Sequence, residues 1–367
     1  MSFVTGFSRF SPRAGFKEIG NKLNRVDLLQ NIYLAGLKIN IPENVNNNLA
    51  YLSKIQQDIA CCKYMRKADI FLFYNGSGLI SSKKIRKHGG IAIVEAVNSH
   101  VHFQEEILKQ EYRSLNLKWT AFHKKEKQRR LLEYKQADYI LLPSEFVKRT
   151  FIDMGFPEEK LLKVPYGFNL LTAPDNTEDY TSNREFVVLY VGNVSIRKGL
   201  RYLIQGFNKL KHPRKKLIIV GTRSDESGIQ DISISSNVVF TGELKSLDLE
   251  NAYKSATVFC LPTIEDGFGL VLGEALSYGK PIIATSNSGA SEIIKDGQEG
   301  FIVPIRDPNV IAEKLQALAD DTHLYQNMRN AAMQRAAHLS GWQETGEKLI
   351  HTLYYAYKQH KKINEPA

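Results

Sequence analysis

The sequence predicts an α/β protein with two doubly wound, Rossmann-like domains, each a parallel sheet covered by helices. Three observations support this fold class. The chain has 367 residues, more than one ordinary hydrophobic core accommodates. Short runs rich in Val, Ile and Leu alternate with segments of helical periodicity. A polar stretch, TAPDNTEDYTSNRE at 172–185, divides the chain near its middle and is the predicted linker.

The first predicted domain covers residues 1–171. Its expected strands are SFVTGFSRF, DIFLFYN, GIAIVEAV, DYILLPS and KLLKVPYG. Helical patterns fall at 16–36, 49–67, 103–136 and 144–155. This alternation of strand and helix predicts a parallel sheet.

The second predicted domain covers residues 186–340 and shows the same alternation more clearly. Its expected strands are EFVVLYVGN, KKLIIVGT, NVVFTG, ATVFCLPT, KPIIATS and GFIVPI. The last segment, residues 341–367, contains WQETGEKLIHTLYYAYKQ, which has an apolar stripe at helical spacing. We expect this helix to pack back on the first domain.

Composition indicates a globular protein, with 43% hydrophobic and 24% charged residues. No run of about 18 apolar residues and no long apolar leader is present, so we expect a cytoplasmic protein. Three cysteines, Cys61, Cys62 and Cys260, cannot form a disulfide framework and have no metal-ligand spacing, so we expect buried packing residues.

The net charge of +10 is concentrated in the first half. Residues 1–170 contain 27 Lys and Arg against 16 Asp and Glu, whereas residues 171–367 contain 22 against 23. The runs KKIRKH (83–88) and HKKEKQRR (123–130) are the most basic. They suggest an anionic partner, which could be a phospholipid surface, a lipid-phosphate acceptor or nucleic acid. Each run is equally well explained as a solvated helix face.

A loop rich in glycine and acid, EDGFGLVLGEAL, follows the strand ATVFCLPT. Ligands of parallel sheets bind beyond the carboxyl ends of strands. A helix starting near Leu270 would direct free amides at an anion, which Gly267 and Gly269 would allow to come close. Asp266 and Glu274 would lie about 10 Å apart, the span of a nucleotide diphosphate sugar between its two sugar rings. The alternative is a capping Asp266 and a surface Glu274.

This segment, with the residues that follow it as far as GFIVP, resembles the donor site of retaining GT-B glycosyltransferases, the group 1 enzymes similar to glycosyltransferase family 4. Their pattern is Glu, seven residues, Glu, which corresponds here to Asp266 and Glu274. Because the first acid is Asp with Glu265 beside it, either of these two could contact the sugar. LYVGNVSIRKGLRYLIQGF resembles the segment that grips the diphosphate: Lys198 matches the family's Lys, while Asn193 replaces its Arg, for which Arg197 could compensate.

The resemblance also points to two residues of the first half. Gly15, in SPRAGF, occupies the place of the family's glycine loop, although a plain turn explains it as well. His100, in EAVNSHVHFQEE, matches a histidine near the reacting sugar, although loop histidines are usually structural. His102 follows it, but no third or fourth metal ligand accompanies the pair and no Asp-x-Asp motif is present.

The resemblance thus implies catalytic and donor-binding residues and no metal or cofactor. The catalytic residues would be His100, Asp266 and Lys198. The donor-binding residues would be Gly15, Asn193, Arg197, Lys198, Glu265, Gly267, Phe268, Gly269, Leu270 and Glu274.

The implied reaction is metal-independent transfer of a hexose-type sugar from a nucleotide diphosphate sugar to a hydroxyl of a saccharide or lipid-linked acceptor. Anomeric configuration would be retained, and the pathway would build a polysaccharide or glycolipid. The enzyme would be cytoplasmic or peripheral on the inner membrane face. An epimerase of the same fold and a noncatalytic protein that binds anionic ligands are the alternatives.

Two further classes fit the sequence poorly. A dinucleotide-dependent oxidoreductase needs an acid near the end of the next strand, and KPIIATSNS supplies none. A nucleic-acid-binding protein would show interleaved aromatic residues and a known module, which we do not find, so no nucleic-acid partner is expected.

Overall fold

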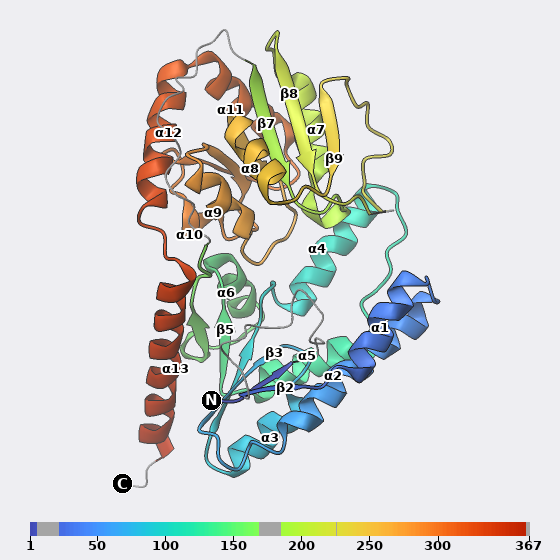
Figure 1. The fold of residues 1–367 in the computed structure, drawn as a ribbon, viewed down its shortest axis with the longest axis vertical. Helices are drawn as coiled ribbons and strands as arrows, with labels where there is room; N and C mark the ends of the chain where they lie inside the picture. Colours follow the sequence, from blue (N-terminus) through green and yellow to red (C-terminus); the bar gives the residue numbers. More distant parts are fainter. Residues whose placement is uncertain (6–21, 169–184, 225, 365–367) are drawn as a thin grey trace.

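The computed structural model describes residues 1–5, 22–168, 185–224 and 226–364 (Figure 1). It confirms the predicted α/β class: all strand pairs in its three sheets are parallel, and helices cover the two larger sheets. Gly15 and most of the predicted linker lie outside the described residues.

The C-terminal sheet contains all six strands expected in the second half. They are β7 (Phe186–Val191), β8 (Lys215–Val220), β9 (Val238–Gly242), β10 (Val258–Leu261), β11 (Ile282–Thr285) and β12 (Gly300–Val303). Their order across the sheet is β12-β11-β10-β7-β8-β9. The direction of winding therefore reverses between β7 and β10, and the loops that follow these two strands lie side by side.

Helices cover both faces of this sheet (Figure 1). They are η3 (Ile196–Lys198), α7 (Leu200–Lys209), α8 (Ser246–Ser255), α9 (Leu270–Ser277), α10 (Ala290–Ile293), α11 (Pro308–Asp320) and α12 (Thr322–Ala336). The buried strand residues include Val188, Phe259 and Ile283, each fully inaccessible to solvent. Continuous apolar strands form because both faces of a parallel sheet are covered.

The N-terminal half contains a four-stranded sheet in the order β3-β4-β5-β6 and a separate pair, β1-β2. The strands are β1 (Phe3–Thr5), β2 (Leu23–Arg25), β3 (Ile70–Tyr74), β4 (Ile91–Glu95), β5 (Tyr139–Leu142) and β6 (Leu161–Lys163). The helices are α1 (Leu28–Lys38), α2 (Glu43–Cys61), α3 (Leu79–Lys87), α4 (Val101–Ser114), α5 (Lys124–Gln136), α6 (Glu145–Ile152) and η2 (Glu158–Lys160).

Two helix predictions in this half were wrong in part. The segment 16–36 contains strand β2 before α1 begins at Leu28. The segment 103–136 is two helices, because the chain leaves the helical conformation after Ser114 and Asn116 takes a positive φ of 54°. Helix α3, which contains most of the run KKIRKH, was not among the predicted helices, although a helix face was one explanation of that run. Its inner face buries Ser81, Ser82 and Ile85.

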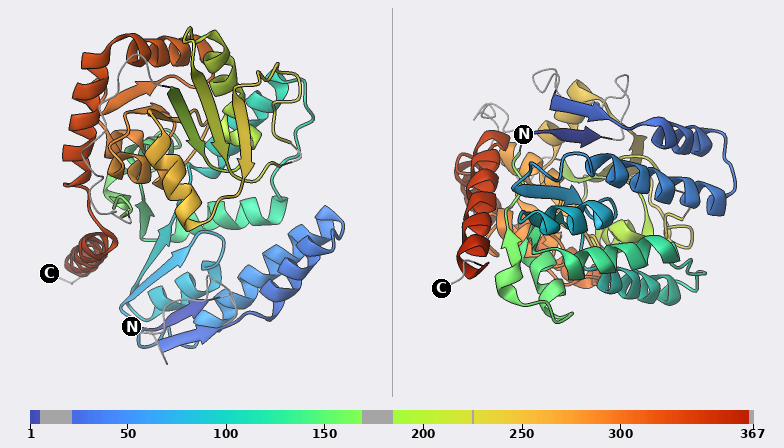
Figure 2. Two further views of the ribbon diagram at one scale, coloured as in Figure 1. Left: turned by 45° about the horizontal axis from the view of Figure 1, so that its top comes forward. Right: turned by 90° about the horizontal axis from the view of Figure 1, so that it is seen from below.

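The last helix, α13 (Trp342–Asn364), returns to the N-terminal half (Figures 1 and 2). Its buried Ala356 belongs to one apolar cluster with Ile91 and Ile93 of β4. The Tyr357 hydroxyl donates a hydrogen bond to Asp69 Oδ1 at 3.0 Å. Of the three free cysteines, Cys61 and Cys260 are buried and Cys62 is half-buried.

Candidate functional site

The loops after β7 and β10 are bonded to each other at the reversal point of the C-terminal sheet. The Arg197 carbonyl accepts hydrogen bonds from Ile264 N at 2.9 Å and from Thr263 Oγ1 at 3.1 Å. Gly199, which follows η3, has a φ of 62°, and a Cβ there would lie 2.1 Å from the Pro262 carbonyl oxygen. Glycine is therefore required for the two loops to approach this closely.

Lys198 and Asp266, one from each loop, form an ion pair between Nζ and Oδ2. Their side chains are only 17% and 13% exposed. Burial alone would raise the pKa of Asp266, but the positive charges of Lys198 and Arg197 outweigh it and lower that pKa. Asp266 is therefore ionised at neutral pH. The pair places a cation and a hydroxyl-accepting carboxylate at one point of the sheet edge.

Glu265 points away from this pair, into the N-terminal half. Its side chain is inaccessible to solvent. Oε1 accepts from Ser99 N at 3.1 Å and Ser99 Oγ at 2.8 Å, and Oε2 accepts from Gln104 Nε2 at 2.9 Å. Arg197 Nη1 lies 3.0 Å from Oε2. With four donors around it, the Glu265 carboxylate joins the two halves and is not open to a sugar in this structure.

Arg197 and Asn193, expected at the diphosphate, differ in their surroundings. Burial would lower the pKa of Arg197, but the charges of Glu265 and Asp266 outweigh it and raise that pKa. The guanidinium is thus held between two acids. Asn193 is exposed, and its Oδ1 accepts from Thr222 Oγ1 at 3.1 Å.

The glycine turn lies against the N-terminal half and opens helix α9. A Cβ on Gly267 would lie 1.7 Å from the Val97 carbonyl oxygen, so the two backbones are in direct contact. Phe268 is 3% exposed and packs against the Tyr166 ring at 5.3 Å. Gly269, with a φ of 80°, is the N-cap and provides no side-chain cap, while Leu270 begins the helix and is 39% exposed. The uncapped start of α9 favours an anion.

Glu274 lies in α9, about one turn beyond the helix start, and is half-buried. Its Oε2 accepts a hydrogen bond from the Tyr253 hydroxyl at 2.8 Å. Burial, together with the charge of Glu274, raises the pKa of Tyr253, so the hydroxyl stays protonated and donates. Tyr253 in turn stacks on Tyr278 at 5.1 Å. Glu274 is therefore held in one orientation.

His100 lies in a different environment from the one expected for a residue facing the reacting sugar. Its side chain is 2% exposed, and its ring lies 5.0 Å from Phe151 and 5.4 Å from Tyr134. Nδ1 accepts from the His102 backbone N–H at 3.3 Å and so caps α4. Burial, with a smaller contribution from His102, lowers the pKa of His100 to about 4. Burial among aromatic rings leaves the ring neutral and enclosed in this structure, and a role of His100 near the reacting sugar stays a prediction.

Helix α4 supplies interface residues that sequence reasoning missed. Gln104 bonds to Glu265, as described above, and Glu111 is inaccessible to solvent. Glu111 accepts from the Tyr202 hydroxyl at 2.8 Å and from Arg306 Nε at 2.6 Å, both in the C-terminal half. The sequence contains a pattern that could have predicted this buried face. Gln104 and Glu111 are seven residues apart and flank the apolar pair at 107–108, so all four lie on one side of the helix.

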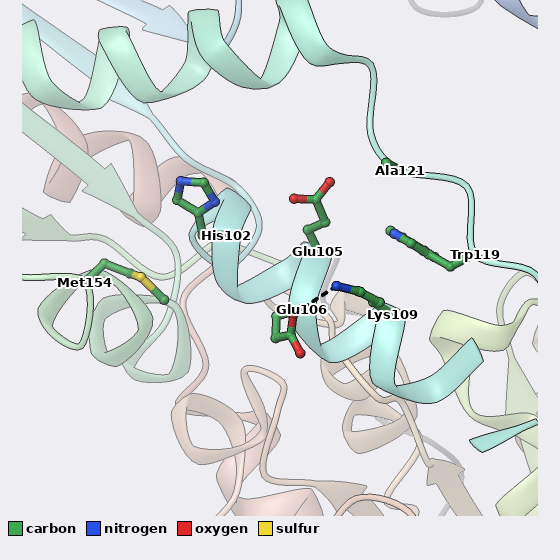
Figure 3. Close-up of a pocket in the computed structure, with 7 residues that line it drawn as sticks. All are labelled: His102, Glu105, Glu106, Lys109, Trp119, Ala121 and Met154. Carbon is green, nitrogen blue, oxygen red and sulfur yellow. Dashed lines mark ion pairs between the residues drawn. The ribbon is translucent and has the colours of Figure 1, made fainter. Parts of the chain in front are cut away.

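The opposite face of α4 borders a cavity of about 490 Å³ (Figure 3). Its lining residues are His102, Glu105, Glu106, Lys109, Trp119, Ala121 and Met154. Glu105 is paired with Lys127 at 2.5 Å, and Lys109 lies 4.0 Å from Glu106. Carboxylates near an aromatic ring can accept hydrogen bonds from hydroxyls while the ring packs on an apolar face.

No group of three or more His, Cys, Asp or Glu side chains is arranged to hold a metal ion in the described parts of the chain. No helix among the residues that the structure describes combines the length and apolarity needed to cross a bilayer.

Comparison with known proteins gives a family match in the second half. Residues 174–335, which include Lys198, Asp266 and Glu274, match the family model described as Glycosyl transferases group 1. This match covers less than half of the chain. A curated relative, the capsular polysaccharide biosynthesis glycosyltransferase CapM of Staphylococcus aureus, is 32% identical over 160 residues, which cover 42% of each chain. The chain spans about half the length of the curated relatives it matches.

Solved structures extend the likeness to the whole fold. The Anabaena protein HepE in complex with UDP has a TM-score of 0.63 at 17% identity, covering 82% of both chains. Sucrose-phosphate synthase from Thermosynechococcus elongatus has a TM-score of 0.64 at 21% identity, covering 86% of this chain and 81% of its own. At such identities the likeness shows the fold alone, which is the GT-B fold expected from the sequence.

Proposed function

We propose that this protein is a retaining glycosyltransferase. It would transfer a hexose-type sugar from a nucleotide diphosphate sugar to a hydroxyl of a saccharide or lipid-linked acceptor, in polysaccharide or glycolipid biosynthesis. The observation that carries the proposal is the Lys198–Asp266 pair at the reversal point of the segment that matches group 1 glycosyltransferases, next to the uncapped start of α9. The UDP complex of the similarly folded HepE supports a nucleotide donor.

In this proposal, the chemistry is electrostatic stabilisation of a departing diphosphate. Lys198 and the start of α9 would stabilise its negative charge, which makes a metal ion unnecessary. Once the diphosphate engages Lys198, Asp266 is free to accept hydrogen bonds from the sugar hydroxyls. Glu274, held by Tyr253, would accept from the ribose hydroxyls.

Retention of configuration would follow from attack on the same face of the sugar that the diphosphate leaves, with a diphosphate oxygen taking the proton of the acceptor hydroxyl. Asp266 and Glu274 would hold opposite ends of one donor, so neither is assigned as a covalent nucleophile. His100 is not assigned a proton transfer, because its ring is enclosed and neutral.

We assign the acceptor to the N-terminal side of the site, because the residues assigned here to the donor, Lys198, Asp266 and Glu274, all lie in the C-terminal half. The basic N-terminal half would also contact an anionic membrane surface, making the enzyme peripheral.

The donor assignment is tested by thermal-shift titration with UDP, GDP, ADP and their sugars, followed by detection of released diphosphate. A ligand that binds only the folded state raises the melting temperature. Lys198→Ala and Glu274→Ala should each lower affinity and activity by at least about tenfold, which is the loss of a charge-assisted contact worth roughly 1.4 kcal/mol. Lys254→Ala, a change of an exposed lysine on α8, is the control. Full activity in either site variant would refute the assignment.

Further measurements test whether the protein is an epimerase, whether it retains the anomeric configuration and whether it needs a metal ion. Incubation with donor alone should yield no isomerised sugar, since an epimerase of this fold would produce one without an acceptor. The anomeric configuration of the product, determined by nuclear magnetic resonance, should match that of the donor, and a chelator should leave the rate unchanged.

A further inference from the structure

Helix α1 presents apolar side chains to solvent. Leu28, Ile32 and Leu37 are 65%, 44% and 51% exposed, and Ile39, the C-cap, is 74% exposed. The helix has one charged residue, Lys38, and no acid. Single exposed leucines are ordinary on protein surfaces, but a succession of them on one short helix marks an interaction site.

Helix α2 packs beside α1 and repeats the pattern. Its exposed residues Val45, Leu52 and Ile59 are spaced by seven and therefore share one face. The two helices form a hairpin at the edge of the N-terminal half, away from the C-terminal sheet (Figure 2). We call this pair, residues 28–61, the α1–α2 hairpin.

Hydrogen bonds from polar side chains join the two helices of the hairpin. Ser53 is 1% exposed, and its hydroxyl bonds to Gln30 Oε1 at 3.0 Å. Gln56 Oε1 accepts from Leu29 N at 3.3 Å. Polar groups thus join the helices while apolar groups face outward. Such an arrangement suits surroundings that are themselves apolar.

The surroundings of the hairpin are basic. Between residues 22 and 67, the exposed charged residues are six cations, Lys22, Arg25, Lys38, Lys63, Arg66 and Lys67, and one acid, Glu43. The neighbouring α3, which contacts α2, exposes Lys83, Arg86 and Lys87 and has no acid. A surface with this charge attracts anionic lipid headgroups, each lysine or arginine adding to the attraction.

We propose that the α1–α2 hairpin docks on an anionic lipid bilayer, with Leu28, Ile32 and Ile39, which share one face at the spacing of α1, entering the interface and the surrounding lysines and arginines contacting headgroups. The basic charge of the N-terminal half already suggests contact with an anionic membrane. The hairpin specifies which surface makes that contact and adds apolar side chains to it. Docking does not depend on the glycosyltransferase activity. The described helices are too short or too polar to cross a bilayer, so the association would be peripheral.

A second copy of the chain is a poorer occupant of this face. A twofold contact would bring the same cations of both copies together with a single exposed acid per hairpin to offset them. A bilayer containing phosphatidylglycerol supplies the missing negative charge and the apolar layer together.

The test is flotation with vesicles of phosphatidylglycerol and phosphatidylcholine, compared with phosphatidylcholine alone, without any nucleotide. The variant Leu28→Gln/Ile32→Gln/Ile39→Gln keeps the charge of α1 and removes the three exposed apolar side chains that share one face. The matched control is Leu247→Gln/Ile350→Gln, whose residues are 66% and 62% exposed on α8 and α13. Thermal melting of each variant checks that the fold is intact.

The parent protein should bind the anionic vesicles, more weakly at 0.5 M salt than at 0.1 M. The α1 variant should bind at least about tenfold more weakly, a loss of roughly 1.4 kcal/mol, whereas the control should bind like the parent. Equal binding of parent and α1 variant would overturn the proposal, as would no binding by the parent. A dimeric parent that becomes monomeric in the α1 variant would overturn it in favour of a protein interface. Nucleotide thermal shifts, measured separately, decide the donor site without reference to these results.

Discussion

The buried histidine His100 gives a stability prediction that depends on pH. Its pKa falls to about 4 in the folded protein against 6.5 for the free side chain, because burial disfavours the charged ring. Between these two values the unfolded chain binds a proton that the folded chain does not, so stability rises with pH across this window. At about 1.4 kcal/mol per pH unit, the neutral His100 contributes about 3 kcal/mol to the free energy of unfolding over this window. This contribution is complete above pH 6.5 and is lost as the pH falls toward 4.

The perturbation is His100→Asn, which can still cap α4 but cannot titrate. Urea unfolding at pH 7.0, 5.5 and 4.5 should show that the stability difference between parent and variant shrinks as the pH falls. The two proteins must be compared at each pH because Glu133 also titrates in this range. Burial raises the pKa of Glu133 to about 7, so its contribution to stability falls as the pH rises, equally in both proteins. A constant difference between parent and His100→Asn would refute a buried neutral His100.

The contact between the two halves supports two more predictions. Gly267→Ala would place a methyl group 1.7 Å from the Val97 carbonyl oxygen, so we expect about 1–3 kcal/mol of destabilisation in thermal melts. Gly346→Ala, with open space around it in α13, should show none. Glu111→Ala would leave Arg306 without its carboxylate and should cost about 3 kcal/mol, measured by urea unfolding. If Glu111→Ala unfolds at the urea concentration of the parent, α4 does not join the halves as described.

The C-terminal sheet was predictable because its strands are short continuous apolar runs bounded by glycine or proline. Val188 and Phe259 are inaccessible to solvent in adjacent strands, and such burial on both faces is what produces these runs. The N-terminal half was less predictable. Strand β2 is three residues long and pairs only with β1, so it leaves no alternation to detect. The break after α4 depends on one residue in the left-handed region, Asn116. No glycine or proline near it in the sequence predicts the end of the helix.

The sequence also placed Lys198 and Asp266 together, since both follow strands that meet at a reversal point and the family pattern aligns them. The surroundings of His100 could not be predicted from the sequence. Whether a histidine after a strand faces a ligand or a core depends on the rings that surround it, and here Tyr134, Phe151 and Phe156 come from residues 34 to 56 positions away. Local sequence does not specify that packing.

Glu265 and Asp266 show most clearly what the tertiary structure decides. They are adjacent acids in the loop after β10, and the sequence left open which of them contacts the sugar. In the structure Ser99 and Gln104 of the N-terminal half donate hydrogen bonds to Glu265, which also pairs with Arg197. Asp266 is thereby left with Lys198. Replacing Gln104 by Leu should therefore disturb the donor site indirectly, lowering nucleotide affinity although Gln104 touches no part of the proposed donor.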